Sequence, residues 1–326
     1  MTKGLRTKVF AKVNLRLRVR GKRSDGYHDL DTLFDEVDFG EELAFMPTSA
    51  GGFDLELSGA AAGLPSGDDN LVLRAARAVV AAFGLDCSGR FALLKRLPAG
   101  AGLGGGSADA AAAMRLLAAH AGLDLESAEV LDRLEAVGRT IGADVAFFVR
   151  GGRAMARGRG DEPRSLAVEP CLHYALVLPG LHCETKAVYA RWHPALQDEG
   201  AALGFAREGE AAAPSATVSD QVVLTPNGEL EGVFNDLQAA AMSAYPDLAD
   251  LCASLVAASG VALHLSGSGS TLFAVHGKEA RIAERAELLR GALARMRAAG
   301  VDVPAAAQVV VARSLRPAER AIHSLS

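Results

Sequence analysis

Cysteine, long apolar runs and an excess of charge of one sign are all scarce in this sequence. The four cysteines contain no Cys-x-x-Cys pair, which argues against a disulfide framework or a zinc site. No segment reaches the ~18 apolar residues that a membrane span requires, and the first twenty residues lack the apolar core of a signal peptide. A net charge of −5 argues against a surface for nucleic acid. We therefore expect a soluble cytoplasmic protein with no membrane or nucleic-acid partner.

The length of 326 residues allows two domains, because single domains commonly run to roughly 100 to 200 residues. A glycine- and arginine-rich stretch, GGRAMARGRGDEP, ends near residue 165, so we expect one domain over residues 1–165 and another over 166–326. Strands grouped beside helices predict an α+β fold in both halves. Residues 197–220 lack apolar periodicity and predict a mobile surface loop or insertion.

The most informative stretch is residues 90–122, where an apolar run and a proline lead into five glycines and an alanine-rich helix. We predict that this helix opens at Ser107, with Ser107 as its cap. Residues without a Cβ let a polyanion reach main-chain N–H groups, and a helix start favours negative charge. The stretch therefore predicts a phosphate-binding loop, although a glycine run taken alone also suggests a flexible linker. The glycines are Gly100, Gly102, Gly104, Gly105 and Gly106.

Other glycine-rich nucleotide sites fit this stretch less well. Gly100, Gly102 and Gly105 satisfy the Gly-x-Gly-x-x-Gly pattern of dinucleotide-binding folds. That fold needs a second strand before its acidic residue, whereas a helix and Gly122 precede Asp124 here. The pattern Gly-x-x-x-x-Gly-Lys-Ser/Thr is absent, which excludes an ordinary P-loop. A dinucleotide-dependent oxidoreductase is therefore a less favoured alternative.

A hairpin is predicted near the start of the chain. Residues 8–20 alternate between apolar side chains and a polar face, which indicates a half-buried strand with its polar face in water. A turn sequence follows, so a second strand should run back over residues 30–39. Lys12 and Asn14 lie on the polar face, where the ordinary interpretation is a pair of solvated side chains. The residues at the mouth of the hairpin are Tyr27 and His28, and aromatics at hairpin ends are ordinarily packing residues.

Apolar spacing and turn residues predict the other elements. The helices expected are 69–83, capped by Asp68 or Asp69, then 107–120, 130–141, 235–244 and 246–258. The strands expected are 91–97, 173–178, 261–265 and 271–275. Asp144 follows a helix that ends at Gly142, and its ordinary interpretation is a turn aspartate that caps the next element. Ser266 to Ser270 forms a small-residue turn between the last two of these strands.

Five segments of the sequence together resemble the GHMP kinases, whose phosphate loop reads Pro-x-x-x-Gly-Leu-Gly-x-Gly-Ser. The segments are AKVNLRL, SDGYHDLDT, LPAGAGLGGGSADAA, GADVAFF and LSGSGSTLFAV. They resemble most the branch of that family that acts on a cytidine-diphospho-methylerythritol, and GYHDLDT is the most discriminating of the five. Two features depart from the pattern: Ala146 replaces a proline, and DEVDFGEEL is unusually acidic.

The resemblance implies a fold and a reaction. The fold is a two-domain α+β fold, with an N-terminal α/β domain for nucleotide and catalysis. The C-terminal α+β domain has a ferredoxin-like sheet, and the active site lies in the cleft between the domains. The reaction is ATP-dependent phosphorylation of the 2-hydroxyl of a small cytidine-diphospho substrate, in the non-mevalonate isoprenoid pathway, with Mg²⁺ neutralising the phosphates. The metal ligands stay open, with Ser107 as one contributor, and so does the choice between a monomer and a homodimer.

The resemblance also implies roles for individual residues. Asp144 would orient the hydroxyl proton, and Lys12 would offset charge on the transferred phosphoryl group. Tyr27 and Tyr189 would offer ring faces to the pyrimidine, and His28 would meet its edge. The implied nucleotide-binding residues are Lys95, Pro98, Ala99, Gly100, Ala101, Gly102, Leu103, Gly104, Gly105, Gly106, Ser107 and Ala108. The implied substrate-binding residues are Asn14, Tyr27, His28, Thr185, Tyr189, Gly267, Ser268 and Gly269.

Several alternatives stay open from the sequence. Another GHMP kinase, acting on mevalonate, homoserine or a sugar, would share the loop and Asp144 but would not need Tyr27 and His28. A catalytically inactive relative that binds nucleotide as a regulator would not need Lys12 and Asp144. Lys95 has a bland interpretation as a solvated strand end, and Asp109 as a complement to the helix dipole.

Overall fold

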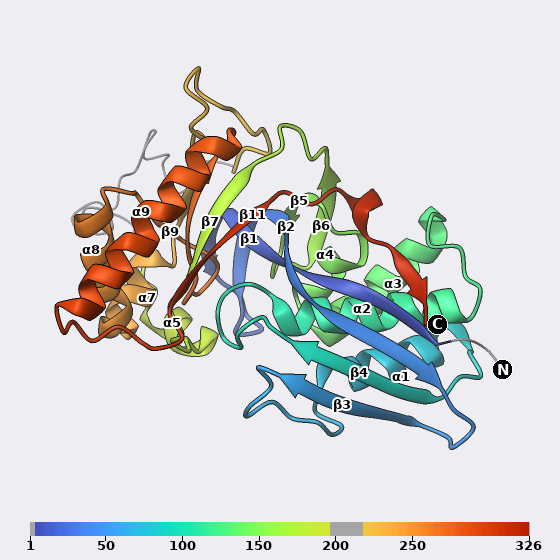
Figure 1. Ribbon diagram of the computed structural model, residues 1–326. Helices are drawn as coiled ribbons and strands as arrows, with labels where there is room; N and C mark the ends of the chain where they lie inside the picture. The colour runs from blue at the N-terminus through green and yellow to red at the C-terminus, as the bar shows by residue number, and fades with distance from the viewer. Residues whose placement is uncertain (1–3, 196–217, 326) are drawn as a thin grey trace.

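The computed structural model describes residues 4–195 and 218–325, which form two β-sheets with helices packed on each (Figure 1). Most of the loop predicted over residues 197–220 lies outside the described residues. The chain passes from the first sheet to the second between Leu166 and His173. No helix in the described part of the chain combines the length and the apolar character that crossing a membrane requires.

The first sheet has eight strands, with the order β12-β1-β2-β4-β3 and three further strands that pair beside this path. Its strands are β1 (Leu5–Lys22), β2 (His28–Pro47), β3 (Phe53–Gly59), β4 (Gly89–Lys95), β5 (Arg153–Arg157), β6 (Glu162–Leu166), β8 (Phe234–Asn235) and β12 (Ile322–Ser324). The helices packed against it are α1 (Leu71–Phe83), α2 (Gly105–His120), α3 (Ala128–Ile141) and α4 (Val145–Arg150). The hairpin predicted at the start of the chain is confirmed, since β1 and β2 are antiparallel neighbours.

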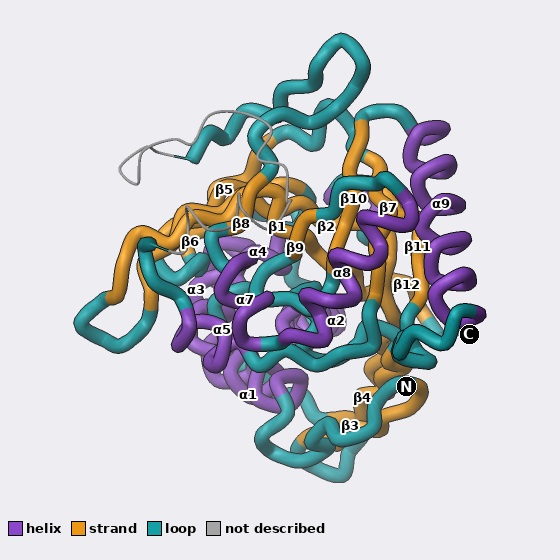
Figure 2. The backbone as a smooth tube through the Cα atoms, turned by 90° about the vertical axis from the view of Figure 1, so that its left-hand side faces the viewer, coloured by secondary structure: helices purple, strands orange, loops and turns teal. Residues whose placement is uncertain are grey.

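The second sheet has four antiparallel strands in the order β11-β7-β10-β9. Its strands are β7 (His173–Leu178), β9 (His264–Leu265), β10 (Leu272–His276) and β11 (Gln308–Arg313). Its helices are α5 (Thr185–Arg191), α7 (Gln238–Ala244), α8 (Pro246–Ser259) and α9 (Glu279–Ala298), and a short 3₁₀ turn, η1 (Pro317–Glu319), follows β11. Numbered along the chain, the strands lie as fourth, first, third and second, so the predicted ferredoxin-like sheet is confirmed. Figure 2 shows α9 running along β11.

Strand β1 is buried on both faces, so the prediction of a half-buried strand is wrong. Its apolar face, with Ala11, Val13 and Leu15, packs against the second sheet in a core shared by both halves of the chain. The polar face is buried as well, and Lys12 and Asn14 are only 4% and 3% exposed. Alternation shows which side chains share a face, but it does not show what covers that face. The polar residues are therefore held inside the protein, where each needs a partner.

Two predicted helix caps are also wrong. Helix α2 begins at Gly105 after Gly104, whose φ of +71° needs no side chain, so Ser107 lies inside the first turn. Helix α1 is capped by Asn70, whose Oδ1 accepts from the Val72 N–H at 2.9 Å, rather than by Asp68 or Asp69. The Ser107 hydroxyl therefore does not cap α2.

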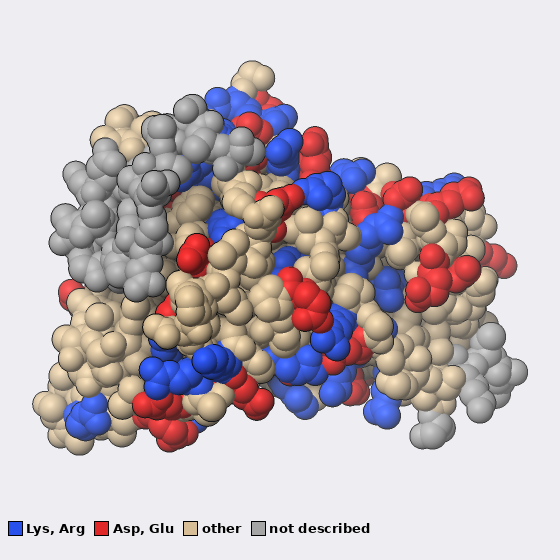
Figure 3. Space-filling view, turned by 90° about the horizontal axis from the view of Figure 1, so that it is seen from above, with Lys and Arg blue, Asp and Glu red and all other residues tan. Residues whose placement is uncertain are grey.

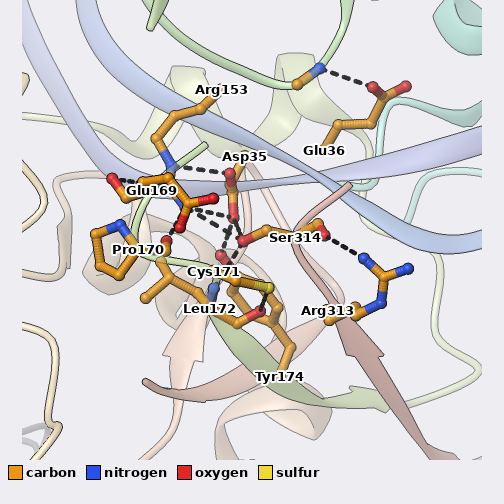
Figure 4. Close-up of polar contacts among 11 residues, drawn as sticks. Asp35, Glu36, Arg153, Glu169, Pro170, Cys171, Leu172, Tyr174, Arg313 and Ser314 are labelled. Atoms are coloured by element: carbon orange, nitrogen blue, oxygen red, sulfur yellow. Dashed lines mark hydrogen bonds and ion pairs between the residues drawn. The ribbon is translucent and has the colours of Figure 1, made fainter. Parts of the chain in front are cut away.

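A buried polar cluster joins the two sheets on one side of the shared core (Figure 4). Asp35 of β2 accepts hydrogen bonds from Arg153 of β5 at 2.9 Å, from the Ser314 hydroxyl at 2.6 Å and from the hydroxyl of Tyr174 of β7. Asp35, Arg153, Tyr174 and Ser314 are each fully buried. The carboxylate thus has partners from both sheets, and the cluster fixes how one sheet lies on the other.

Charged side chains of both signs are interspersed over the face shown in Figure 3. Across the described residues many charged side chains form salt bridges, among them Arg164–Asp220 and Arg316–Glu169. Exposed pairs of this kind contribute little to stability. Losing one partner costs much more in a buried pair, because the other charge then lies inside the protein without compensation.

Arg153→Met should lower the free energy of unfolding by about 3–5 kcal/mol, because it leaves the Asp35 carboxylate buried without its charge partner. The double variant Asp35→Asn/Arg153→Met removes the leftover charge and should recover part of that loss. Thermal unfolding followed by circular dichroism measures both. An Arg153→Met protein as stable as the parent would show that the cluster does not hold the sheets together.

Candidate active site

A cleft of about 1290 Å³ lies where the two halves of the chain meet, and it contains most of the predicted site residues. Those that line it are Lys12, Asn14, Tyr27, His28, Lys95, every residue from Pro98 to Ser107, Asp144, Thr185, Tyr189, Gly267 and Ser268. Two predicted residues do not line it. Ala108 is 2% exposed and packs into the core below the loop, and Gly269 lies against Leu248 and Leu265.

The glycine loop has all four of its carbonyls from Gly100 to Leu103 turned toward the rest of the protein. The donors are the main-chain N–H groups of Cys183 and Thr271, both at 3.1 Å, and of Lys12 at 3.0 Å, with the Ser266 hydroxyl at 2.9 Å. In a trans peptide the following N–H points the opposite way. Within residues 4–195 and 218–325, none of the N–H groups from Ala101 to Ser107 has a protein acceptor. The loop therefore presents free donors, as an anion site requires.

Only glycine fits at two positions of this loop. At Gly102 the φ is +73°, and a Cβ would lie 2.1 Å from the carbonyl oxygen of Ser266. At Gly104 the φ is +71°, and a Cβ would lie 2.8 Å from the ring of Phe148. The missing side chains thus let the loop pack directly on the turn after β9 and on α4.

Lys12 and Asp144 meet below the loop. Lys12 Nζ lies 3.5 Å from Asp144 Oδ2 and donates to Asn14 Oδ1 at 2.6 Å and to the Gly102 carbonyl at 3.2 Å. Burial lowers the pKa of Lys12, and the nearby Asp144 charge opposes that shift. Asp144 directly precedes α4, but its side chain makes no capping hydrogen bond, so its ordinary interpretation as a cap is wrong. Its carboxylate is 29% exposed and faces the cleft.

Asn14 is itself fixed by a residue that sequence reasoning missed. Its Nδ2 donates to the Thr32 hydroxyl at 2.9 Å, and that hydroxyl donates to the Arg16 carbonyl at 2.8 Å. Thr32 lies on β2, opposite Leu17 of the neighbouring β1, and it also lines the cleft. The chain of hydrogen bonds sets the Asn14 amide and, through it, the direction of the Lys12 ammonium. Thr32 is the last residue of GYHDLDT, but the motif alone gives it no role, because its partner Asn14 comes from the neighbouring strand.

A group of aromatic rings lines the cleft at the mouth of the hairpin. His28 stacks on Tyr189 with ring centroids 4.8 Å apart, and Trp192 meets His28 edge-on at 5.5 Å. Burial and the charge of Lys22 lower the pKa of His28. Sequence reasoning missed Trp192, although it is the only tryptophan in the chain.

Tyr27 lies at the rim of the same group, with 58% of its surface exposed. The Arg159 guanidinium covers one face of its ring, 5.1 Å from the centroid. Arg159 is held by Asp161, which accepts from its Nε at 3.0 Å and from its Nη2 at 2.6 Å. Arg159 also lines the cleft and was missed, since its position follows from the turn between β5 and β6.

Lys95 forms a second buried charge cluster at the start of α2, so its interpretation as a solvated strand end is wrong. It is 4% exposed, and its Nζ donates to Glu41 Oε1 at 2.5 Å and to Asp109 Oδ2 at 2.8 Å. Burial opposes its charge, but the two carboxylates raise the pKa of Lys95. Burial and the charge of Glu41 raise the pKa of Asp109, while Lys95 acts in the opposite direction. Among the described residues Asp109 Oδ1 has no hydrogen-bond partner, although it is buried.

The turn after β9 is held in place from the second half of the chain. Asn235 Nδ2 donates to the carbonyls of Leu265 and Gly267 at 2.8 and 2.7 Å. The hydroxyls of Thr185 and Ser268 lie 3.0 Å apart, which links α5 to the turn. The turn also lies against β1, since the Asn14 N–H donates to the Ser266 hydroxyl at 3.4 Å and Asn235 belongs to β8, which pairs with β1.

Comparison with known families identifies both halves of the chain. Residues 70–152 match the GHMP kinases N terminal domain, and residues 224–293 match the GHMP kinases C terminal domain. A 4-diphosphocytidyl-2-C-methyl-D-erythritol kinase of Methylobacterium radiotolerans is 40% identical over 86% of this chain and 93% of its own length. A protein of the same name from Pelotomaculum thermopropionicum is 35% identical over 81% of this chain and 86% of its own.

Solved structures share the fold. A crystal structure of 4-(cytidine 5'-diphospho)-2C-methyl-D-erythritol kinase is 31% identical, with a TM-score of 0.66 over 94% of this chain and 98% of its own. A homoserine kinase from Cytophaga hutchinsonii has a TM-score of 0.63 at 16% identity, over 97% of this chain and 96% of its own. At this low identity, the match to the homoserine kinase shows only that the fold is shared.

Gly102→Ala should weaken nucleotide binding by roughly tenfold or more, because the new Cβ meets the Ser266 carbonyl and forces the loop donors out of place. Equilibrium titration with a fluorescent ATP analogue measures the affinity. Gly51→Ala is the matched control, since Gly51 also has a positive φ of +74° but has open space around it. Equal nucleotide affinity in the two variants would contradict the role of the loop.

Proposed function

The chain belongs to the GHMP kinases, within the family of the 4-diphosphocytidyl-2-C-methyl-D-erythritol kinases, and we propose that it phosphorylates the 2-hydroxyl of 4-diphosphocytidyl-2-C-methyl-D-erythritol. ATP supplies the phosphoryl group, and the products are the 2-phosphate of the substrate and ADP. The observation that carries this proposal is the Lys12–Asp144 pair, 3.5 Å apart, below a loop of free N–H donors.

Asp144 is the candidate acceptor of the hydroxyl proton. Its carboxylate faces the cleft and has no competing cap contact, so a substrate hydroxyl can approach it. As the hydroxyl oxygen bonds to the γ-phosphorus and the bond to the β,γ-bridging oxygen breaks, the proton passes to Asp144. ADP leaves with the electron pair of the broken bond.

Lys12 is the candidate for charge stabilisation. Its ammonium is buried and already oriented by Asn14 and by the Gly102 carbonyl, so it needs little reorganisation when charge develops on the phosphoryl oxygens. The loop N–H groups and the start of α2 would hold the other phosphate oxygens. The site thus combines fixed positive charge with main-chain donors.

Mg²⁺ is part of the proposal, because it neutralises the β,γ-phosphates when it enters with ATP. Among the described residues no group of three His, Cys, Asp or Glu side chains could hold a metal ion. A cation carried by phosphate oxygens and water needs only one or two protein oxygens. Ser107 and Asp109 line the cleft beside the loop, and they are the candidates for such protein oxygens.

The aromatic group supports a pyrimidine nucleotide as acceptor substrate. Tyr27, His28 and Tyr189 all line the cleft, and His28 stacks on Tyr189, so aromatic surface is available there to a pyrimidine ring. A mevalonate or homoserine substrate has no ring that would use them. A catalytically inactive regulator is disfavoured, because both Lys12 and Asp144 are present and face the same cleft. The cytoplasmic location and the monomeric or homodimeric state stay predictions.

An ADP-release assay tests this function. The purified protein, given ATP and Mg²⁺, should turn over 4-diphosphocytidyl-2-C-methyl-D-erythritol in preference to mevalonate or homoserine. Asp144→Ala should reduce kcat by ~10²-fold or more, since the proton acceptor is lost, while ATP still binds. A preference for either of the other alcohols, or parental turnover in Asp144→Ala, would refute the proposal.

The pH dependence of kcat should report Lys12. Because burial lowers the pKa of Lys12, its ammonium loses its proton, and kcat falls, at a pH below the ordinary lysine value. The Lys12 side chain is charged below that pKa and neutral above it, so kcat falls on the alkaline side. Lys12→Arg, which keeps its charge throughout, should show no alkaline loss in whatever activity remains. The same alkaline midpoint in both proteins would assign it to another group.

A further inference from the structure

Helix α4 connects Asp144, the candidate proton acceptor, to a cluster of charged side chains at the other end of the helix. The helix has six residues, so it spans only about 9 Å from Asp144 to its last residue. Its residues Val145 to Val149 are buried. The carbonyls of its last turn have no partner within the helix, and buried carbonyls need donors from elsewhere. Those donors therefore also decide where α4, and with it Asp144, lies.

Two arginines supply these donors. Arg320 donates from Nη2 to the Phe148 carbonyl at 2.7 Å and from Nη1 to the Val149 carbonyl at 3.2 Å. Arg115 of α2 donates to the same Val149 carbonyl at 2.9 Å. A positive charge at the C-terminal end of a helix is favourable in itself. Arg320 lies between η1 and β12, so a segment from the end of the chain holds the last turn of α4.

A buried carboxylate on β2 completes the cluster. Glu36 is fully buried, its Oε1 lies 3.5 Å from Arg320 Nε, and its Oε2 accepts from the Gly152 N–H at 2.8 Å. Burial raises the pKa of Glu36, and the charge of Arg320 opposes that shift. Glu36 lies directly opposite Lys12 of β1, so both side chains project from the same face of the sheet. This face therefore holds α4 at both ends, through Lys12 at Asp144 and through Glu36 just beyond the helix.

Arg320 is fixed in this position. Its side chain is only 8% exposed, and its main-chain N–H donates to the Pro317 carbonyl at 3.1 Å. The carbonyl of the next residue, Ala321, accepts from the hydroxyl of Thr7 of β1 at 2.9 Å. A Cβ on Gly151, the residue after α4, would lie 2.8 Å from Arg320 Nη1, so the guanidinium packs directly against the end of the helix.

We propose that Arg320 is a positioning residue for phosphoryl transfer: it holds the C-terminal end of α4 and thereby keeps the Asp144 carboxylate where it can accept the proton of the substrate hydroxyl. This inference rests on the proposed function, and it gives the C-terminal segment a part in catalysis. Arg320 is not one of the residues that line the cleft. Its loss should therefore affect kcat and leave the binding of both substrates unchanged.

Arg320→Lys tests the proposal, because lysine keeps a positive charge beside Glu36 but lacks the planar fork that reaches two carbonyls. In the ADP-release assay kcat should fall roughly tenfold, while the KM values for ATP and for 4-diphosphocytidyl-2-C-methyl-D-erythritol keep their parental values. Arg316→Lys is the matched control, since Arg316 lies in the same segment but is 59% exposed and pairs with the exposed Glu169. This control should keep the parental kcat.

The Asp144→Ala protein separates positioning from a purely structural role. Because Arg320 acts through Asp144, adding Arg320→Lys to Asp144→Ala should leave the residual kcat unchanged. Damage to the fold as a whole would instead lower that residual kcat by the same factor as in the parent. Every kcat is measured below the unfolding transition of the variant, which circular dichroism locates.

A parental kcat in Arg320→Lys overturns the inference, and so does a further tenfold fall in kcat when Arg320→Lys is added to Asp144→Ala. A rise in either KM with an unchanged kcat overturns it as well. Failure of the proposed function looks different: the parent would prefer another alcohol, such as mevalonate or homoserine, and the same comparison of kcat with that alcohol would still test Arg320.

Discussion

The cleft depends on the direction in which the glycine loop turns its carbonyls. All four carbonyls from Gly100 to Leu103 are bound by neighbouring segments, and the donors come from β1, from the residues before α5 and from the stretch between β9 and β10. This anchoring leaves the loop N–H groups free for an anion. The second half of the chain therefore does more than close the cleft, because Cys183, Ser266 and Thr271 set the conformation of a loop that belongs to the first half.

Lys12 and Lys95, the two buried lysines of the cleft, pair with different numbers of carboxylates, and this difference gives them different roles. Lys95 has two carboxylates within 2.8 Å, and its pKa is raised in spite of burial. Lys12 has a single carboxylate at 3.5 Å, and its pKa is lowered. A tightly paired ammonium mainly fixes the elements around it, here β2, β4 and α2. A loosely paired one keeps part of its charge available to a phosphate.

The sequence was a good guide where a local chemical need marks the residue. The glycines of the loop could be predicted because a positive φ and close backbone approach both exclude side chains, and the hairpin because its turn residues and alternation agree. It failed where tertiary packing decides. The polar face of β1 was predicted to be solvated, because nothing in residues 8–20 shows that the glycine loop and α2 cover it. Thr32, Arg159 and Trp192 were given no role because their partners lie on other elements of the fold. The start of α2 was wrongly predicted at Ser107, because the N-cap position is held by Gly104, which has no side chain that could mark it.

The strand that carries Lys12 also pairs with strands from the second half of the chain. β1 pairs with β2 directly, but it also pairs with β8 at Phe234–Asn235 and with β12 at Ile322–Ser324. In Figure 1 the start of β1 and the red strand β12 accordingly lie side by side. During synthesis β1 emerges before β8 and β12, so one of its edges stays unpaired until those strands follow. A chain in which β8 and β12 have not yet paired thus exposes an open strand edge on which another copy can pair. Pairing of these two strands with the strand that carries Lys12 therefore also removes an edge that is prone to aggregation.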